Sequence, residues 1–148
     1  MKLLLLIVCL YISLPGHSKA ESEYEVLTLV TTNGNAHLFD VELALSDSQK
    51  RLGLSGRLKL APNQGMLFFF ETPKIVSMWM KETLMPLDII FISNNGIVTY
   101  IKHSAIPMTE SLVKSKVKVQ GVLELNAGIS LKLGIKPGTK VIHHLFKQ

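Results

Sequence analysis

The stretch LDIIFISNNGIVTYI, residues 87–101, decides the expected fold. Two runs rich in apolar, β-branched and aromatic residues flank the turn sequence SNNG, and this pattern predicts a β-hairpin. Nearer the N-terminus, EVLTLVT and AHLFDVELA are joined by Asn33, Gly34 and Asn35, which predicts a second hairpin. Two hairpins in a short chain favour an antiparallel sheet as the main element of the structure.

The chain between the hairpins adds a helix and two further strands. Ser46, with Gln49 three residues later, makes a capping-box pattern and predicts a short helix that ends at Gly53 or Gly56. The apolar run MLFFF predicts a buried strand, and KIVSMWM predicts the next strand.

The C-terminal third continues the same mixture. VKSKVKVQ alternates between valine and lysine, which predicts an edge strand whose lysines oppose pairing with another chain, or alternatively a basic stripe for an anionic glycan or lipid. GVLELNAGISLKLG predicts a strand and then a helix with Asn126 as N-cap and Gly134 as stop, and KPGTKVIHHLF predicts a last strand. The sum is a mostly β (α+β) fold, a small antiparallel β-barrel-like domain of about seven strands with two short helices.

The first twenty residues have the pattern of a secretory signal peptide. Lys2 precedes an apolar run from Leu3 to Leu14, and small residues lead up to Ala20. We therefore expect export to the periplasm or the exterior after cleavage near Ala20, with residues 21–148 as a single domain. No later stretch approaches the roughly twenty apolar residues that a membrane span requires.

Composition narrows the classes of partner. The only cysteine, Cys9, lies in the expected signal, so the mature domain has no thiol and folds without disulfides. Loss of Lys2 and Lys19 lowers the formal net charge of +5 by two, and a mildly basic chain gives no argument for nucleic acid. We expect a monomer without a cofactor.

Four segments resemble the bacterial and archaeal family called domain of unknown function 192. They are RLGLSGR, GMLFFF, MWMKETLMPLDIIFI and VLELNAGISLKLGIKPG, and they span the chain from about Phe39 to Val141. The resemblance implies a compact, mostly β domain that is often exported and has no established activity. Many relatives carry cysteines after the second hairpin, whereas this chain has AIPMTESLVKSK there, so a redox or disulfide role is not expected.

Asp88 begins a strand face that is otherwise apolar. In one interpretation it braces the turn KETLMP and pairs with Lys81, Arg51 or Arg57. In the other it lies in a cleft beside Trp79, where burial would raise its pKa and allow proton transfer. Spacing alone leaves both open.

The sequence does not contain a complete set of catalytic residues. His103, His143 and His144 do not have the spacing of a zinc site. Glu124 is a candidate second carboxylate beside Asp88, in a hydrolase of envelope glycans, if their strands are neighbours. An enzyme is therefore the alternative hypothesis, and these two residues are its catalytic candidates.

A binding module accounts for more of the sequence. Trp79 offers a ring that can stack on a sugar or pack over a cation, unless it is a core residue. Arginine and lysine side chains offer donors to an acidic or hydroxylated ligand. The candidate ligand-binding residues are Arg51, Arg57, Trp79, Lys81, Asp88 and Glu124. We expect a binding or accessory module of the cell envelope whose partner is a small molecule, a glycan or an envelope protein.

Methionines raise one further alternative. Met78 and Met80 flank Trp79, and thioethers in an exported chain suit monovalent copper. Methionines beside apolar runs are also common core residues. A periplasmic copper-binding protein therefore stays a third hypothesis.

Overall fold

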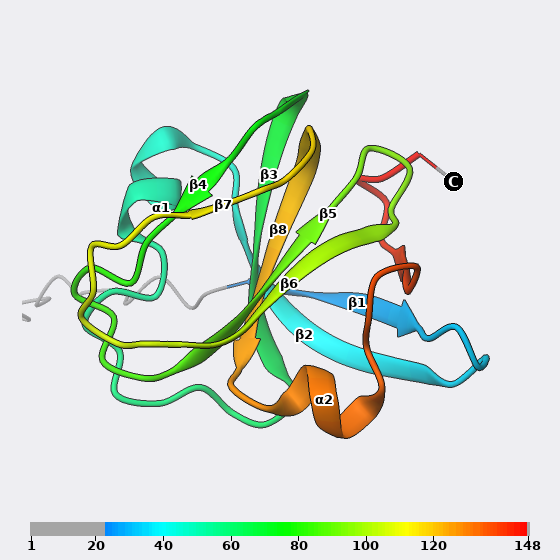
Figure 1. Ribbon diagram of the computed structural model, residues 1–148, viewed down its shortest axis with the longest axis horizontal. Helices are drawn as coiled ribbons and strands as arrows, with labels where there is room; N and C mark the ends of the chain where they lie inside the picture. Colours follow the sequence, from blue (N-terminus) through cyan, green and yellow to red (C-terminus); the bar gives the residue numbers. More distant parts are fainter. Residues whose placement is uncertain (1–22, 148) are drawn as a thin grey trace, which may run out of the picture.

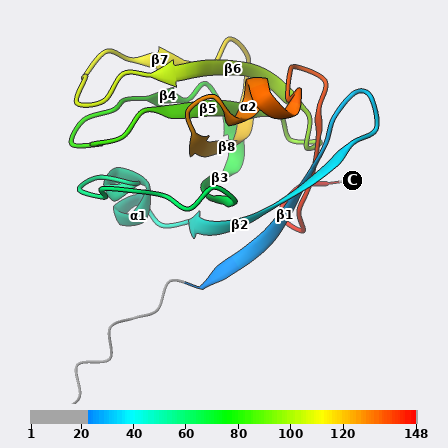
Figure 2. The same ribbon diagram turned by 90° about the horizontal axis from the view of Figure 1, so that it is seen from below.

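The computed structural model describes residues 23–147, and in this range the main sheet has seven strands in the order β6-β5-β8-β3-β2-β1-β9 (Figure 1). The sheet curls strongly into a half-barrel, and β4 and β7 form a separate pair beside it (Figure 2). The elements are β1 (Tyr24–Val30), β2 (Ala36–Ala44), α1 (Asp47–Leu52), β3 (Gln64–Lys74), β4 (Ser77–Met78), β5 (Leu87–Ile92), β6 (Val98–Ala105), β7 (Val113–Lys114), β8 (Val119–Asn126), α2 (Ile129–Leu133) and β9 (Lys140–Ile142). The predicted mostly β fold with two short helices is confirmed. No helix among the described residues is long and apolar enough to cross a membrane.

One strand pair departs from the antiparallel pattern. β2 and β3 run parallel, with Asp40 opposite Gln64 and Ala44 opposite Phe68, whereas the other neighbours in the sheet are antiparallel. Parallel neighbours need a crossover connection, and here α1 and the loop after it carry the chain back to the starting end of β2. The expectation of a purely antiparallel sheet is therefore wrong at this pair.

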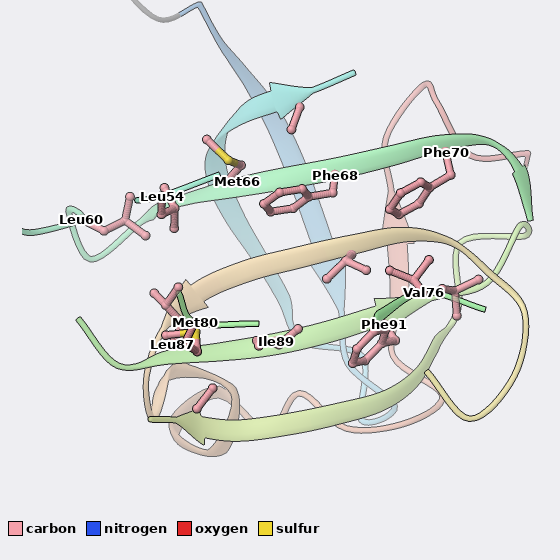
Figure 3. Close-up of a cluster of buried hydrophobic side chains, with 14 of the residues drawn as sticks. Leu54, Leu60, Met66, Phe68, Phe70, Val76, Met80, Leu87, Ile89 and Phe91 are labelled. Atoms are coloured by element: carbon pink, nitrogen blue, oxygen red, sulfur yellow. The ribbon is translucent and has the colours of Figure 1, made fainter. Parts of the chain in front are cut away.

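The central strands β3, β5 and β8 contribute side chains to both faces of the sheet. Every residue of β5 is buried, which explains the unbroken apolar run LDIIFI. Ile90 and Ile92 pack on one face with the cluster that includes Leu67 and Phe146. The opposite face carries a second cluster (Figure 3), which includes Leu54, Met66, Phe68, Phe70, Met80, Leu87, Ile89 and Phe91. Neighbouring positions along β5 therefore point into two different cores.

Two predicted strands have different bounds in the structure. KIVSMWM is a strand only at Ser77–Met78, and VKSKVKVQ is divided between β7 and the start of β8. The chain leaves the strand at Ser115, whose hydroxyl accepts a hydrogen bond from Val76 N at 2.9 Å. From Val119 onward the chain lies between β5 and β3, so the prediction of one edge strand is wrong there. Local alternation could not show which strands would flank this segment.

The first helix follows the predicted cap. Ser46 Oγ accepts from Gln49 N at 3.2 Å, and the Gln49 side chain accepts from Ser46 N at 2.9 Å, which completes a capping box. The helix ends at Gly53, where φ is +50°. Both ends of α1 are therefore confirmed.

The second helix begins differently from the prediction. Its N-cap is Gly128, not Asn126, and Gly128 makes no side-chain cap. The Asn126 amide instead donates to the carbonyls of Leu60 and Ala61, at 3.1 and 3.0 Å, and anchors the loop before β3. The predicted stop at Gly134 is confirmed, with φ of +69°.

Candidate functional site

A small pocket of about 70 Å³ is lined by residues from the end of α1 and from the segment around β4. We call it the inner pocket. It is lined by Lys50, Arg51, Leu52, Gly53, Leu54, Ser55, Phe68, Ser77, Met78, Trp79, Lys81, Thr83 and Glu124. A wider outer cleft of about 480 Å³ shares Arg51 and Trp79 with it and continues toward Phe70 and Lys74.

Glu124 is the buried polar group of the inner pocket. It lies on β8 opposite Met66 of β3 and Ile89 of β5, so its side chain leaves the same face as the apolar cluster of Figure 3. Its exposed fraction is only 4%, and within residues 23–147 its carboxyl has no hydrogen bond or ion pair. Burial raises the pKa of Glu124 to about 8. At neutral pH the carboxyl is therefore mostly protonated and offers both a donor and an acceptor.

Cations and an aromatic ring line the pocket beside this carboxyl. Lys50 and Arg51 come from the last turn of α1, and Lys81 follows β4. Trp79 is 47% exposed, and Lys81 Nζ lies 5.6 Å from its ring centroid. The Trp79 ring therefore presents an accessible surface at the pocket, next to Lys81, whose Nζ also lies 3.4 Å from Glu110 Oε1.

The outer cleft continues this combination of cations and aromatic rings. The Nζ atoms of Lys50 and Lys74 lie 5.1 and 4.6 Å from the ring centroid of Phe70. A cation over an aromatic face is held in place while its charge stays available to solvent. The cleft outside the inner pocket is therefore lined by the cations Lys50, Arg51 and Lys74 and by one carboxylate, Asp47.

Asp88 lies on the other face of the sheet. It pairs with Leu125, whereas Glu124 pairs with Ile89, and successive residues of a strand point to opposite faces. Asp88 and Glu124 therefore do not share a site, although their strands are neighbours. A hydrolase that uses these two carboxylates lacks the arrangement that it requires.

The hydrogen bonds of Asp88 indicate that it stabilises the fold. Its Oδ1 accepts from Ser104 N at 2.9 Å, and its Oδ2 accepts from Ser130 N at 2.9 Å and from Ser130 Oγ at 2.6 Å. Burial acts to raise the pKa of Asp88, but hydrogen bonds from Ser130, Ser104 and Gly128 outweigh it, so the pKa lies below its ordinary value. Asp88 thus links β6 and the start of α2, and its partners are not the predicted Lys81, Arg51 or Arg57.

Arg57 also lies away from the lining of both cavities. Its guanidinium binds the Glu42 carboxylate with two contacts, Nη1 to Oε1 and Nη2 to Oε2, the second at 2.7 Å. The hydrogen bonds that Arg57 donates to the Glu42 carboxylate raise the pKa of Arg57. Tyr24 donates to the same carboxylate at 3.1 Å. This bidentate pair ties the loop after α1 to β2.

The structure thus assembles four of the six predicted binding residues, Arg51, Trp79, Lys81 and Glu124, and separates Arg57 and Asp88 from them. Lys50 also lines the pocket, although it is not among the residues predicted from the sequence, where it precedes Arg51 in the expected helix. Met78 lines the pocket, whereas Met80 is buried in the apolar cluster. Met80 is therefore a core residue, which was the alternative to its being a copper ligand.

The fold and the pocket define a small, mostly β domain with a candidate ligand site. The chain belongs to the DUF192 family, described as "Uncharacterized ACR, COG1430", whose model matches residues 28–143. All four sequence segments that carried the resemblance lie within this range.

Two solved structures are similar over most of their length. One, a "putative transcription regulator" from Sinorhizobium meliloti, has 41% identity and a TM-score of 0.79, with 82% of this chain and 96% of that chain covered. The other, a protein of unknown function from Novosphingobium aromaticivorans, has 35% identity and a TM-score of 0.80, with 86% and 90% covered. No curated protein matches the chain.

Proposed function

We propose that the protein is an exported binding module of the cell envelope that holds an acidic sugar unit between α1 and β4. The observation that carries this proposal is the buried carboxyl of Glu124, which has no partner among the described residues 23–147 and lies in a pocket lined by Arg51, Lys81 and Trp79. A buried polar group without a partner costs free energy, and a ligand that supplies the missing hydrogen bond removes that cost.

Each lining group suits one part of such a ligand. The protonated carboxyl of Glu124 can donate to a hydroxyl or carbonyl oxygen of the ligand. Arg51 and Lys50 can bind its carboxylate or phosphate through charge-assisted hydrogen bonds. Trp79 can pack on the apolar face of a sugar ring. The combination favours a ligand that is ringed, hydroxylated and anionic.

The volumes of the two cavities fit a ligand that enters the inner pocket with only one of its groups. The inner pocket of about 70 Å³ has room for one small polar group, while the outer cleft of about 480 Å³ is large enough for a ring. We infer that a hydroxyl-bearing group of the ligand enters the inner pocket and that the ring and its anionic group stay in the outer cleft.

The expected location supports an envelope ligand. The secretory signal pattern of residues 1–20 lies outside the described residues, and export remains part of the proposal. The relative described as a "putative transcription regulator" suggests DNA as another partner class. The mild net charge and the signal pattern favour the envelope sugar.

Fluorescence of Trp79, the only tryptophan of the chain, tests the proposal directly. Glucuronate and glucose 6-phosphate are titrated at low salt, with glucose as the neutral comparison and a DNA duplex as the alternative partner. We expect a saturable change with the acidic sugars, a weaker one with glucose and no turnover of either sugar.

Arg51→Gln should weaken binding of the acidic sugars, because it removes a cation from the pocket. Lys132→Gln is the matched control, since Lys132 is an exposed cation in the last turn of α2 and does not line the pocket. Equal affinity of wild type and Arg51→Gln, or saturation by DNA alone, would rule out the proposal.

A further inference from the structure

A second group of side chains, separate from the inner pocket, meets where the C-terminal segment passes β1. The Nε2 atoms of His143 and His144 lie 3.1 and 2.7 Å from the same atom, Oε2 of Glu25. One ligand atom from each residue can be chosen so that all three lie within 4.8 Å of one another. Two imidazoles and one carboxylate therefore converge on one point.

The nitrogen of His143 in this cluster is buried and has no hydrogen-bond partner in the part of the chain that the structure describes. His143 is 5% exposed, and although its Nε2 is near Glu25, the geometry is not that of a hydrogen bond. Buried polar atoms without a partner are rare in folded proteins and call for an explanation. A ligand seated between the two histidines and Glu25 would supply one.

We propose that Glu25, His143 and His144 bind one divalent transition-metal ion. Imidazole nitrogen and carboxylate oxygen suit Zn²⁺ and Cu²⁺, whereas Mg²⁺ and Ca²⁺ prefer oxygen ligands alone. Three protein ligands leave a coordination position for water. The partly exposed Glu25 and the exposed His144 give the ion a route from solvent.

Loading the site requires the three ligand atoms, now within 4.8 Å of one another, to adopt the spacing of a metal site. Zinc bonds of about 2.0–2.1 Å place tetrahedral ligand atoms about 3.3 Å apart, so the His144 and Glu25 atoms must separate slightly. Metal binding at Nε2 also puts the His143 proton on Nδ1, which now accepts from Leu145 N at 3.4 Å. That bond is at the long limit of hydrogen bonding, and its loss is a minor cost beside two metal–nitrogen bonds.

The bound ion would link the two ends of the described domain. Glu25 and His144 are 119 residues apart in the sequence, and β9 pairs with β1 immediately before the histidines. An ion that binds this arrangement and not the unfolded chain must raise the unfolding temperature.

The test is calorimetric titration of the metal-free protein, purified without a histidine tag, with ZnCl₂. We expect one zinc per chain, displacement by Cu²⁺, and no binding of Mg²⁺ or Ca²⁺. Glu25→Gln and His144→Gln should each weaken zinc binding by about tenfold or more, because changes even to residues that orient metal ligands reach that size.

Two matched variants separate the site from general zinc binding. Glu23→Gln removes a neighbouring exposed carboxylate, and His103→Gln removes an imidazole that bonds to Ser130 Oγ at 2.9 Å. Both should bind zinc as the wild type does, and the Leu145 amide NMR signal should shift only when zinc binds. The proposal fails if zinc does not bind, if Glu25→Gln binds zinc normally, or if the two controls weaken binding equally.

Discussion

Asp88 and Glu124 lie on adjacent strands of the sheet but project from opposite faces. The register pairs Asp88 with Leu125 and Glu124 with Ile89, so the two carboxyls are one pairing step apart and on different sides of the sheet. Their surroundings differ accordingly. Asp88 is hydrogen-bonded through both carboxylate oxygens and has a lowered pKa, whereas Glu124 has no hydrogen-bond partner within residues 23–147 and has a raised pKa. One carboxyl therefore stabilises the fold, and the other remains available to a ligand.

Replacement of Asp88 by Asn should lower stability without affecting the inner pocket. The variant loses charge-assisted hydrogen bonds from Ser130 and Ser104, which should cost about 2 kcal/mol of unfolding free energy. Urea denaturation measures this loss, and Trp79 fluorescence titration measures ligand binding. A variant of wild-type stability that binds acidic sugars less well would contradict the assignment.

Acid should remove the contribution of Asp88. Because its pKa is lower in the native state than in the unfolded chain, this contribution is complete above the ordinary Asp pKa of 3.8 and is lost as pH falls through the native value. Unfolding temperatures of wild type and Asp88→Asn should therefore converge as pH falls from 7 toward 2. A constant difference across this range would show that the Asp88 charge is not the cause.

Glu124 should have the opposite pH dependence. The native state holds its proton up to about pH 8, whereas the unfolded chain releases it near pH 4.5, so stability falls as pH rises between these values. Glu124→Gln cannot ionise and should lack this decline, and it should be more stable than the wild type at pH 9. Unfolding temperatures from pH 4 to 9 test this. Parallel curves for the two proteins would refute it.

The same ionisation should affect ligand binding. Above about pH 8 the Glu124 carboxylate repels an anionic ligand and can no longer donate a hydrogen bond. Glucuronate affinity should therefore drop between pH 7 and 9 in the wild type and stay nearly constant in Glu124→Gln, as followed by Trp79 fluorescence. A similar drop in both proteins would point to another titrating group.

Gly121 should not tolerate a side chain. A Cβ at this position would lie 2.6 Å from Cζ and 3.0 Å from Cε1 of the buried Phe146 ring. Gly121→Ala should therefore lower the free energy of unfolding by about 1–3 kcal/mol, the usual range for overpacking.

A double-mutant cycle identifies the cause of that loss. In urea denaturation, Phe146→Leu should cost less in the Gly121→Ala protein than in the wild type, because the smaller side chain relieves the clash. Strictly additive losses would mean that the ring is not responsible.

Local sequence predicted the elements whose signals lie within a few residues. The SNNG turn, the Ser46–Gln49 capping box and the stop at Gly134 all form as expected, because turns and caps are made by near neighbours. Strict alternation along a strand also puts Glu124 on the same face as Val122, as the structure has it. These predictions needed no knowledge of which strands pair.

Local sequence patterns could not predict which strands pair. The parallel pairing of β2 with β3 and the central position of β8 depend on which apolar faces are buried together over long sequence separations. For the same reason, the sequence grouped Asp88 with Glu124, and it gave no sign that Glu25 would meet His143 and His144.

The sequence by itself thus determined a mostly β fold, its hairpins, the capping box of α1 and the stop of α2, and it named four residues of the inner pocket. Only the tertiary structure decided which of those residues share a site. Side chains of a strand alternate between two faces, so one step of register separates the proposed binding group, Glu124, from the structural group, Asp88, and contacts distant in sequence set that register.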